Sequence, residues 1–152
     1  MSNDILDLRT LKKGSVLFVE GEPSTYLYII KTGSILILRD DNNRITPLAN
    51  IGAKQFLGEI SIFTDETRTA NAIVTEESQV YLIKKSDIKK VIRDCPDWLS
   101  EIMETLCDRL KHASDVLREH KITTDGQVLN VDSTQEKAYL EALSKHRSAR
   151  GL

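Results

Sequence analysis

The sequence predicts an α+β domain in which an antiparallel β-roll, a jelly-roll-like barrel, is flanked by an N-terminal helix and by C-terminal helices. Short β-rich runs recur at regular spacing in the first half of the chain and end at Gly, Asn and Asp turns, as in a sandwich or barrel. Apolar residues at spacings of three and four in the second half indicate helices. With 152 residues, the chain is long enough for about one domain with a single core.

The first expected element is a short amphipathic helix over residues 4–12. Ile5, Leu8 and Leu11 are spaced for one helical face, and Gly14 is suited to end the helix. Six strands should follow, because each run is rich in β-branched or aromatic residues and is bounded by turn residues. They cover residues 15–19, 26–30, 34–38, 45–51, 70–75 and 79–84, and the glycines at 14, 21 and 33 are assigned to turns.

Two helices are predicted after the strands. The first begins with Ser86 as its N-cap and ends before Pro96, and the second begins near Pro96. The second carries an apolar stripe over more than five turns. Its members are Leu99, Ile102, Met103, Leu106, Leu110, Ala113, Val116 and Leu117. Either the whole stripe covers the β-roll of its own chain, or the half from Leu106 to Leu117 forms a two-helix seam in a homodimer.

The domain organisation expected is a main domain over residues 1–121, including the long helix, and a linker with a short helical basic tail over residues 122–152. The pattern Ser133-Thr134-Gln135-Glu136 is a capping box that opens the tail helix. No space remains after the long helix for a winged helix-turn-helix.

Composition argues against several classes of function. A net charge of −2 gives no electrostatic reason to expect nucleic acid as a partner. No apolar window is long enough for a membrane span and no leader is evident, so we expect a cytoplasmic protein without a membrane partner. Cys95 and Cys107 are interpreted as reduced structural thiols. No histidine cluster or catalytic motif indicates a metal, a cofactor or an enzyme.

Residues 56–72 combine a glycine, a carboxylate, a short apolar turn and an arginine between two strand-like runs. Gly58 allows a backbone to approach a ligand, and residues 59–63 can form a helical turn whose free N–H groups point at an anion. Arg68 can fork onto two phosphate oxygens, and Glu59 can accept a hydrogen bond from a sugar hydroxyl. The pattern therefore indicates a ligand with one phosphate and one ribose. The alternative is a surface ion pair beside a loop.

This stretch resembles the phosphate-binding cassette of the cyclic nucleotide-binding domain family, which includes the catabolite activator protein and the protein kinase A regulatory subunit. Leu57 departs from the pattern, because most members have a polar or small residue there. The turn glycines and core residues of the β-roll fit as well, so that the resemblance covers roughly residues 5–120. The cassette pattern is met by Gly58, Glu59, Ile60, Ser61, Ile62, Arg68, Thr69 and Ala70.

The resemblance implies roles for these residues. Glu59 would accept from the ribose 2′-hydroxyl, and Arg68 would pair with the equatorial oxygen of a cyclic phosphate. Backbone N–H groups near Ser61 and the Thr69 hydroxyl would complete the anion cradle. Thr69 is compatible with cAMP and with cGMP. Ser114 falls where the long helix of the catabolite activator type contacts the base, although an exposed helix serine is the simpler interpretation.

The function expected from this resemblance is a stand-alone cAMP or cGMP receptor that signals through a ligand-dependent protein–protein interface. A different possibility is an interaction or scaffold protein that uses the long helix and the tail and whose nucleotide pocket is vestigial. Retention of the charged cassette residues argues for the receptor. A transcription factor and a nucleotide hydrolase are both disfavoured, since the sequence offers neither a DNA-reading module nor metal ligands.

Overall fold

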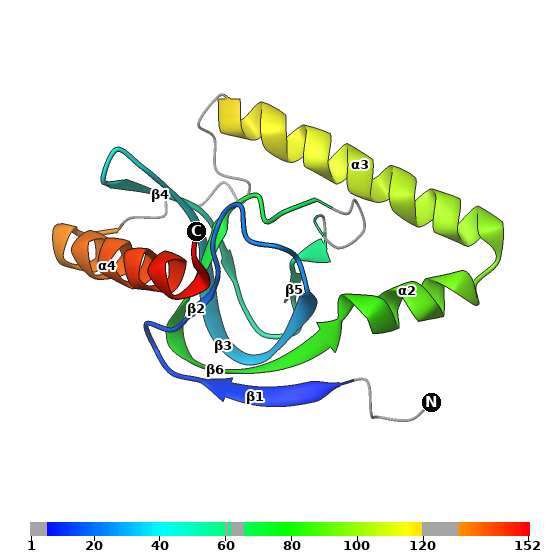
Figure 1. Ribbon diagram of the computed structural model, residues 1–152, viewed down its shortest axis with the longest axis horizontal. Helices are drawn as coiled ribbons and strands as arrows, with labels where there is room; N and C mark the ends of the chain where they lie inside the picture. The colour runs from blue at the N-terminus through cyan, green and yellow to red at the C-terminus, as the bar shows by residue number, and fades with distance from the viewer. Residues whose placement is uncertain (1–5, 60, 62–65, 120–130) are drawn as a thin grey trace.

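The computed structural model describes residues 6–59, 61, 66–119 and 131–152 (Figure 1). Its described elements are one antiparallel sheet, as the sequence predicted, and three helices, which correspond to the three that the sequence predicted after the strands. The strands are β1 (Asp7–Leu11), β2 (Val16–Phe18), β3 (Tyr26–Asp41), β4 (Arg44–Ile51), β5 (Phe56–Leu57) and β6 (Asn71–Lys84). The helices are α2 (Lys85–Arg93), α3 (Asp97–Glu119) and α4 (Ser133–Arg150).

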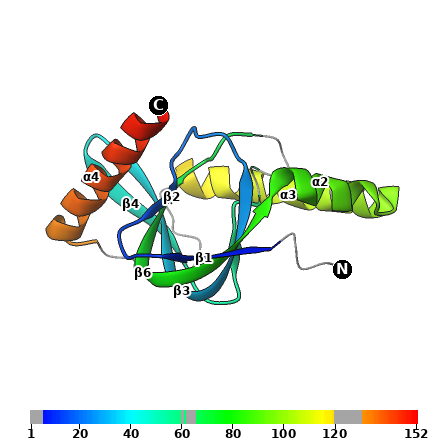
Figure 2. The same cartoon turned by 60° about the horizontal axis from the view of Figure 1, so that its bottom comes forward.

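The sheet has the strand order β1-β6-β3-β4, with β2 paired to β6 and β5 paired to β3. All of these pairs are antiparallel. Among the described residues no pairing joins β1 to β4, so the roll is an open curved sheet and not a closed barrel. In both views α4 lies on one side of the roll and α2 and α3 lie on the other (Figure 1, Figure 2).

The predicted N-terminal helix is wrong over its described residues. Residues 7–11 instead form the edge strand β1, with Asp7 opposite Leu82 and Leu11 opposite Ser78 on β6. Four of the five residues of β1 are exposed. The apolar spacing therefore does not reflect a helical face that packs on a core, and backbone hydrogen bonds to the free edge of β6 decide the conformation.

Two predicted strand breaks lie inside continuous strands. The breaks at residues 31–33 and 76–78 fall opposite one another on β3 and β6, where the register shifts. Gly33 has φ +101°, and an added Cβ would lie 2.1 Å from the Ser78 hydroxyl oxygen, so the two strands can bend together only with glycine there. The predicted turn residues thus mark a bend in the long antiparallel pair of β3 and β6, and each strand continues through it.

The interior contains two apolar clusters. One lies inside the roll and includes Phe18, Tyr28, Ile30 and Leu82. The second lies between the sheet and α4, because Leu143 is fully buried there with Val19, Leu36, Leu38, Ile45 and Ile73. The tail is therefore a helix that completes the core, and it is longer than the sequence predicted.

Both predicted helix caps differ in detail. Helix α2 begins at Lys85 after the N-cap residue Lys84, without a side-chain cap, so Ser86 is not the N-cap. The capping box of α4 is shifted by one residue: the Asp132 carboxylate accepts from the Gln135 backbone N–H, and the Gln135 side chain accepts from Asp132. Aspartate is as good a cap as serine, and the chain direction before the helix selects between them.

Helix α3 leaves most of its apolar stripe uncovered. Its members Ile102, Leu106, Leu110 and Val116 are exposed, and Trp98, which lies outside the predicted stripe, is 62% accessible. Cys107 on the other face is buried. The first interpretation of the stripe, as cover for the β-roll of its own chain, is therefore wrong for these residues.

Candidate functional site

Arg68 lies in the extended segment that leads into β6 and is only 3% exposed. Its backbone is tied to the turn between β2 and β3 in both directions. The Arg68 N–H donates to the Glu22 carbonyl at 2.9 Å, and the Gly21 N–H donates to the Arg68 carbonyl at 2.8 Å. These bonds place a strongly basic side chain inside the roll, where charged residues are rarely found unpaired.

The guanidinium of Arg68 is held by neutral oxygen atoms. Nη1 donates to the Ser61 hydroxyl at 3.1 Å and to the Gly58 carbonyl at 3.3 Å, and Nη2 donates to the Tyr26 carbonyl at 2.6 Å. The guanidinium carbon lies 4.3 Å from the ring centroid of Phe18. Nε is buried and has no hydrogen-bond partner among the residues that the structure describes. One donor of this cation therefore remains available to an acceptor.

Gly58 is required beside the arginine for two reasons. Its φ is +93°, a conformation that side chains other than glycine rarely adopt, and a Cβ at this position would lie 2.5 Å from Nη1 of Arg68. Glycine thus allows the guanidinium to reach the cassette backbone. Glu59 and Ser61, which follow it, have helical backbone conformation, as the sequence predicted for this turn.

Among the described residues, the charges at this site are only partly balanced. Burial lowers the pKa of the Arg68 guanidinium, and the neighbouring Tyr28, Glu22 and Glu59 offset that effect only in part. Burial likewise raises the pKa of Glu59, which the Arg68 charge offsets in part. No carboxylate of the described residues lies within ion-pair distance of Arg68. The surface ion-pair interpretation is therefore wrong, and a bound anion would compensate the buried cation.

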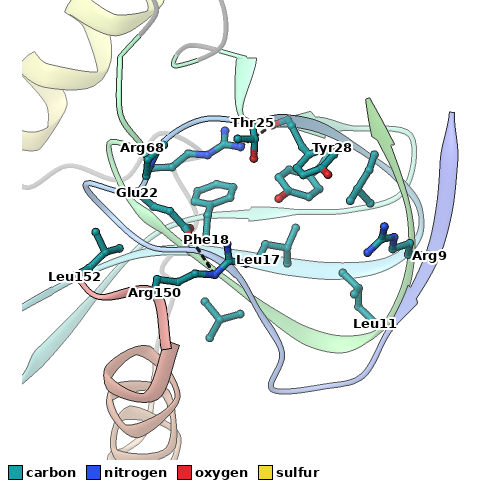
Figure 3. A pocket seen from close by; sticks show the side chains of 14 residues that line it. Arg9, Leu11, Leu17, Phe18, Glu22, Thr25, Tyr28, Arg68, Arg150 and Leu152 are labelled. Carbon is teal, nitrogen blue, oxygen red and sulfur yellow. Dashed lines mark hydrogen bonds and ion pairs between the residues drawn. The ribbon is translucent and has the colours of Figure 1, made fainter. Parts of the chain in front are cut away.

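A cavity of about 440 Å³ adjoins Arg68 (Figure 3). This volume lies within the range of about 300–1,000 Å³ that is usual for small-molecule pockets. Its wall combines apolar residues of β2, β3 and β6 with a few polar groups. The charged and aromatic members of the wall include Arg9, Phe18, Glu22, Tyr28, Arg68 and Arg150.

The structure brings only part of the predicted site together. Gly58, Ser61 and Arg68 are in direct contact, and Glu59 is close enough for its charge to act on Arg68. Of the predicted site residues that are described, Arg68 alone lines the cavity. Thr69 is partly buried and Ala70 is buried beside the arginine in the chain. Ile60 and the side chain of Ser114 lie outside the described residues.

Sequence reasoning missed the partners that come from outside the cassette. Phe18 lies in the predicted strand over residues 15–19, but no sequence signal marked it as the ring beneath the guanidinium. Tyr26 contributes a backbone carbonyl, a group that every residue type possesses, so no sequence pattern could reveal it. Glu22 contributes both its carbonyl and a buried carboxylate, and the only available signal was its place beside a turn glycine.

Helix α3 contacts the cassette on the face opposite its exposed stripe. Lys111 forms an ion pair with Glu66. Cys107 is buried, and burial raises the pKa of its thiol, with a smaller contribution from the Glu59 carboxylate. These contacts connect the long helix to the segment between Gly58 and Arg68.

Neither a metal site nor a membrane span is evident in the part of the chain that the structure describes. No group of three His, Cys, Asp or Glu side chains in this part could hold a metal ion. None of the helices described is long and apolar enough to cross a bilayer.

Comparison with known proteins connects this site to one family. The sequence model of the family described as "Cyclic nucleotide-binding domain" matches residues 8–95, which is more than half of the chain. A CRP-like cAMP-activated global transcriptional regulator of Mycobacterium tuberculosis is 30% identical, with 69% of this chain and 47% of the relative covered. A cyclic nucleotide-gated cation channel protein of Drosophila melanogaster is 29% identical, with 80% of this chain and 19% of the relative covered.

The fold is also shared with solved structures. An EAL enzyme in its cAMP-bound form superimposes with a TM-score of 0.64 at 22% identity, and the match covers 74% of this chain and 30% of the enzyme. The chain spans less than half the length of both curated relatives. What these proteins share with it is therefore one domain.

Proposed function

This chain belongs to the cyclic nucleotide-binding domain family, and we propose that it is a receptor for cAMP or cGMP that acts through a ligand-dependent protein–protein interface. One observation carries the proposal. Arg68 is a buried cation that no described carboxylate pairs, its Nε lacks an acceptor, and it faces a cavity of small-molecule size. A phosphate supplies the missing negative charge and the missing acceptor in one group.

The residue roles proposed for the site follow the cassette. Arg68 binds the equatorial oxygen of the cyclic phosphate, and Glu59 accepts from the ribose 2′-hydroxyl. Backbone N–H groups near Ser61 and the Thr69 hydroxyl complete the anion cradle, with Gly58, Ile60 and Ala70 shaping it. Ser114 is proposed as a contact to the base.

Ligand binding should rearrange the bonds of Arg68. To donate two hydrogen bonds to a phosphate, the guanidinium must release some of its present acceptors, Gly58 and Ser61 being the weakest held at 3.3 Å and 3.1 Å. Both acceptors belong to the segment between Gly58 and Arg68. Helix α3 adjoins this segment, because Lys111 forms an ion pair with Glu66 and Cys107 is close enough to feel the Glu59 charge. The two states required for signalling then differ in the position of this segment and of α3.

The interface proposed is the exposed apolar face of α3. Trp98, Ile102, Leu106 and Leu110 follow one another at intervals of four residues and are all exposed. An apolar row of this length on one helix is stabilised by pairing with a second apolar helix. We propose a homodimer through α3, together with a regulatory protein partner that binds when the ligand moves this helix.

A scaffold function is the second candidate, and the same exposed face supports it. A chain that only pairs through α3 needs no nucleotide, and its cassette would be a relic. Our proposal also gives the chain no catalytic role, no cofactor besides the ligand, and no nucleic-acid or membrane partner, and it places the protein in the cytoplasm.

Calorimetry on the purified chain tests the receptor. We expect binding of cAMP or cGMP at micromolar concentrations or below and much weaker binding of 5′-AMP. Arg68→Ala should weaken binding by about 2–5 kcal/mol. Arg93→Ala is the matched control, because Arg93 is exposed on α2 and does not line the cavity. A folded, nucleotide-free sample that gives no heat with either cyclic nucleotide would favour the scaffold.

A further inference from the structure

Helix α4 lies outside residues 8–95, the part matched by the family model, yet it is docked on the roll. Leu143 is fully buried between the helix and the sheet, and Tyr139 and Leu140 pack beside it at the edge of the same cluster. Burial of apolar side chains stabilises their contact, so these residues hold the helix against the sheet.

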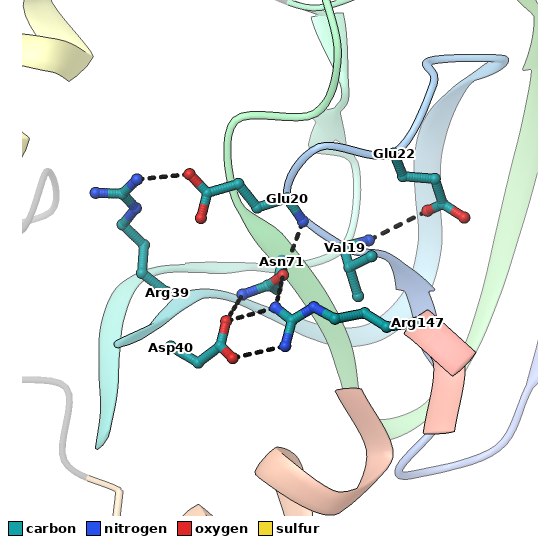
Figure 4. Close-up of polar contacts among 7 residues, drawn as sticks. All are labelled: Val19, Glu20, Glu22, Arg39, Asp40, Asn71 and Arg147. Carbon is teal, nitrogen blue, oxygen red and sulfur yellow. Dashed lines mark hydrogen bonds and ion pairs between the residues drawn. The ribbon is translucent and has the colours of Figure 1, made fainter. Parts of the chain in front are cut away.

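Polar contacts orient the C-terminal half of α4 (Figure 4). Arg147 donates two hydrogen bonds to the Asp40 carboxylate at 2.7 Å and 2.6 Å, with Asn71 as a further acceptor at 3.4 Å. Asn71 is fully buried and donates to Asp40 at 2.9 Å. A bidentate pair supported by a buried amide fixes the rotation of the helix about its axis. None of these three residues lines the cavity beside Arg68.

The last turn of α4 reaches that cavity (Figure 3). Gly151 ends the helix with φ +71°, and Arg150 and Leu152 on either side of it line the cavity wall. The Arg150 Nε lies 3.6 Å from a carboxylate oxygen of Glu22, and the His146 Nε2 lies 3.0 Å from the same oxygen. The wall beside Glu22 is thus built jointly by the roll and by the helix.

Glu22 connects this turn to the cassette arginine. Its carbonyl accepts from the Arg68 backbone N–H at 2.9 Å, while its carboxylate accepts from Val19 N–H at 3.1 Å and faces His146 and Arg150. Among the described residues that line the cavity, Glu22 carries the only side-chain carboxylate. Since a carboxylate repels an anion, the groups that α4 places around it decide how well this cavity tolerates a phosphate.

We propose that the C-terminal turn of α4 forms part of the ligand site, with Arg150 as a binding residue, and that docking of α4 strengthens binding of the anionic ligand at Arg68. This inference rests on the proposed function. Docked α4 brings the Arg150 cation to Glu22 and thereby offsets the negative charge of this side chain on the cavity wall, and the His146 ring contacts the same carboxylate. By reciprocity, the ligand must strengthen the docking of α4 by the same factor.

The experiment uses the full chain and separates docking from direct contact. Arg147→Ala loosens α4 without removing a residue of the cavity wall, and Arg150→Ala removes a wall cation whose side chain is 62% exposed. Lys145→Ala is the matched control on the same helix, because Lys145 is 78% exposed and its one ion pair with a described residue is to Glu141, one turn earlier. Calorimetry with cAMP and cGMP gives the affinities, and thermal melting followed by circular dichroism confirms that each variant is folded.

We expect Arg147→Ala and Arg150→Ala each to bind about 5-fold or more weakly, and Lys145→Ala to bind like the parent. In amide hydrogen exchange, the peptide that covers residues 133–150 should exchange more slowly when the parent chain is saturated with ligand. If Arg147→Ala does not fold, Arg150→Ala and the hydrogen-exchange measurement still test whether α4 contributes to ligand binding.

Two results would overturn the inference, and they are distinguishable. If the parent chain binds a cyclic nucleotide while Arg150→Ala and Arg147→Ala bind equally well or more tightly, α4 does not assist the ligand and only the inference fails. If the parent chain binds neither nucleotide, the proposed function fails and the inference fails with it.

Discussion

The guanidinium of Arg68 lies over the ring of Phe18, with its central carbon 4.3 Å from the ring centroid. Burial opposes the charge of this arginine, and an aromatic face is one of the few apolar surfaces that attracts a cation. Phe18 therefore acts both as a core residue and as support for the cation that the ligand is expected to meet.

This pairing can be measured with a double-mutant cycle. Phe18→Leu and Arg68→Met should each destabilise the ligand-free protein, and the double variant should lose less than the sum of the two. We expect a coupling of about 0.5–2 kcal/mol from urea unfolding. Additivity within about 0.5 kcal/mol would show that the ring and the guanidinium do not interact.

Glu59→Gln should stabilise the ligand-free protein at neutral pH. The folded-state pKa of Glu59 is raised by burial, so the native state binds its proton more tightly than the unfolded state does. Above the raised pKa, the buried Glu59 carboxylate therefore lowers the unfolding free energy of the parent protein. This loss of stability disappears as the pH falls from the raised pKa to the ordinary glutamate pKa. The advantage of the glutamine variant in urea unfolding should shrink in the same window.

The same substitution should weaken cyclic nucleotide binding by about 1–3 kcal/mol, because the amide replaces an ionised acceptor for the ribose hydroxyl. Calorimetry at pH 7 gives this value. A glutamine variant that is more stable and also binds as tightly as the parent would remove Glu59 from the ligand site.

Gly58→Ala and Gly14→Ala form a matched pair of variants. Both glycines have φ near +90°, so alanine should cost each about 1–2 kcal/mol of backbone strain. At Gly14 an added Cβ meets nothing within 4 Å, whereas at Gly58 it would lie 2.5 Å from Nη1 of Arg68. We expect Gly58→Ala to lower stability further and to weaken ligand binding. Equal losses from both would mean that the guanidinium moves aside freely.

Acid should loosen α4 through Asp40. Its pKa is lowered, chiefly by the hydrogen bonds from Arg147, so the pair contributes stability that is present above the ordinary aspartate pKa and is lost as the pH falls through the lowered value. Asp40→Asn should cost about 1–3 kcal/mol at pH 7 and should flatten this acid dependence. Unfolding free energies measured from pH 7 to pH 2, which spans the window below the ordinary aspartate pKa, test both points, and an unchanged acid profile in Asp40→Asn would contradict them.

Leu106→Glu should abolish the proposed dimer. Leu106 is 51% exposed at the centre of the apolar row of α3, and a charge there must face the same charge of a second copy across a symmetric seam. His112→Glu adds a charge at an exposed position outside this row and serves as the control. Sedimentation equilibrium should show a dimer for the parent and the control, and a monomer for Leu106→Glu. A parent chain that is monomeric at high concentration would end the dimer proposal.

Much of the roll could be predicted because its elements have local signals. The β-rich runs and their turns located β2, β4 and the halves of β3 and β6, and the residue spacing located α2 and α3. These local signals gave the wrong element where one pattern is compatible with both a helix and a strand. The spacing of residues 4–12 suits a helix, but the free edge of β6 pairs with residues 7–11 and makes them a strand.

The residues of the cassette could be proposed from the sequence because they too have local signals. Gly58, Ser61 and Arg68 are residue types with special conformational or ionic properties, placed at short spacing, and the structure brings them into contact. The acceptor at Tyr26 and the ring of Phe18 carry no such mark, since one is a backbone carbonyl and the other resembles any core aromatic residue.

By itself, the sequence determined the fold class, because helical and strand periods act over a few neighbouring positions, and its resemblance to a known family indicated that family and the candidate residues of the cassette. Only the tertiary structure decided that Arg68 is buried over Phe18, that the row on α3 remains exposed, and that α4 returns to the cavity. The Arg147–Asp40 pair that holds α4 joins residues 107 positions apart. Contacts over such distances depend on how the whole sheet curves, which no local pattern encodes.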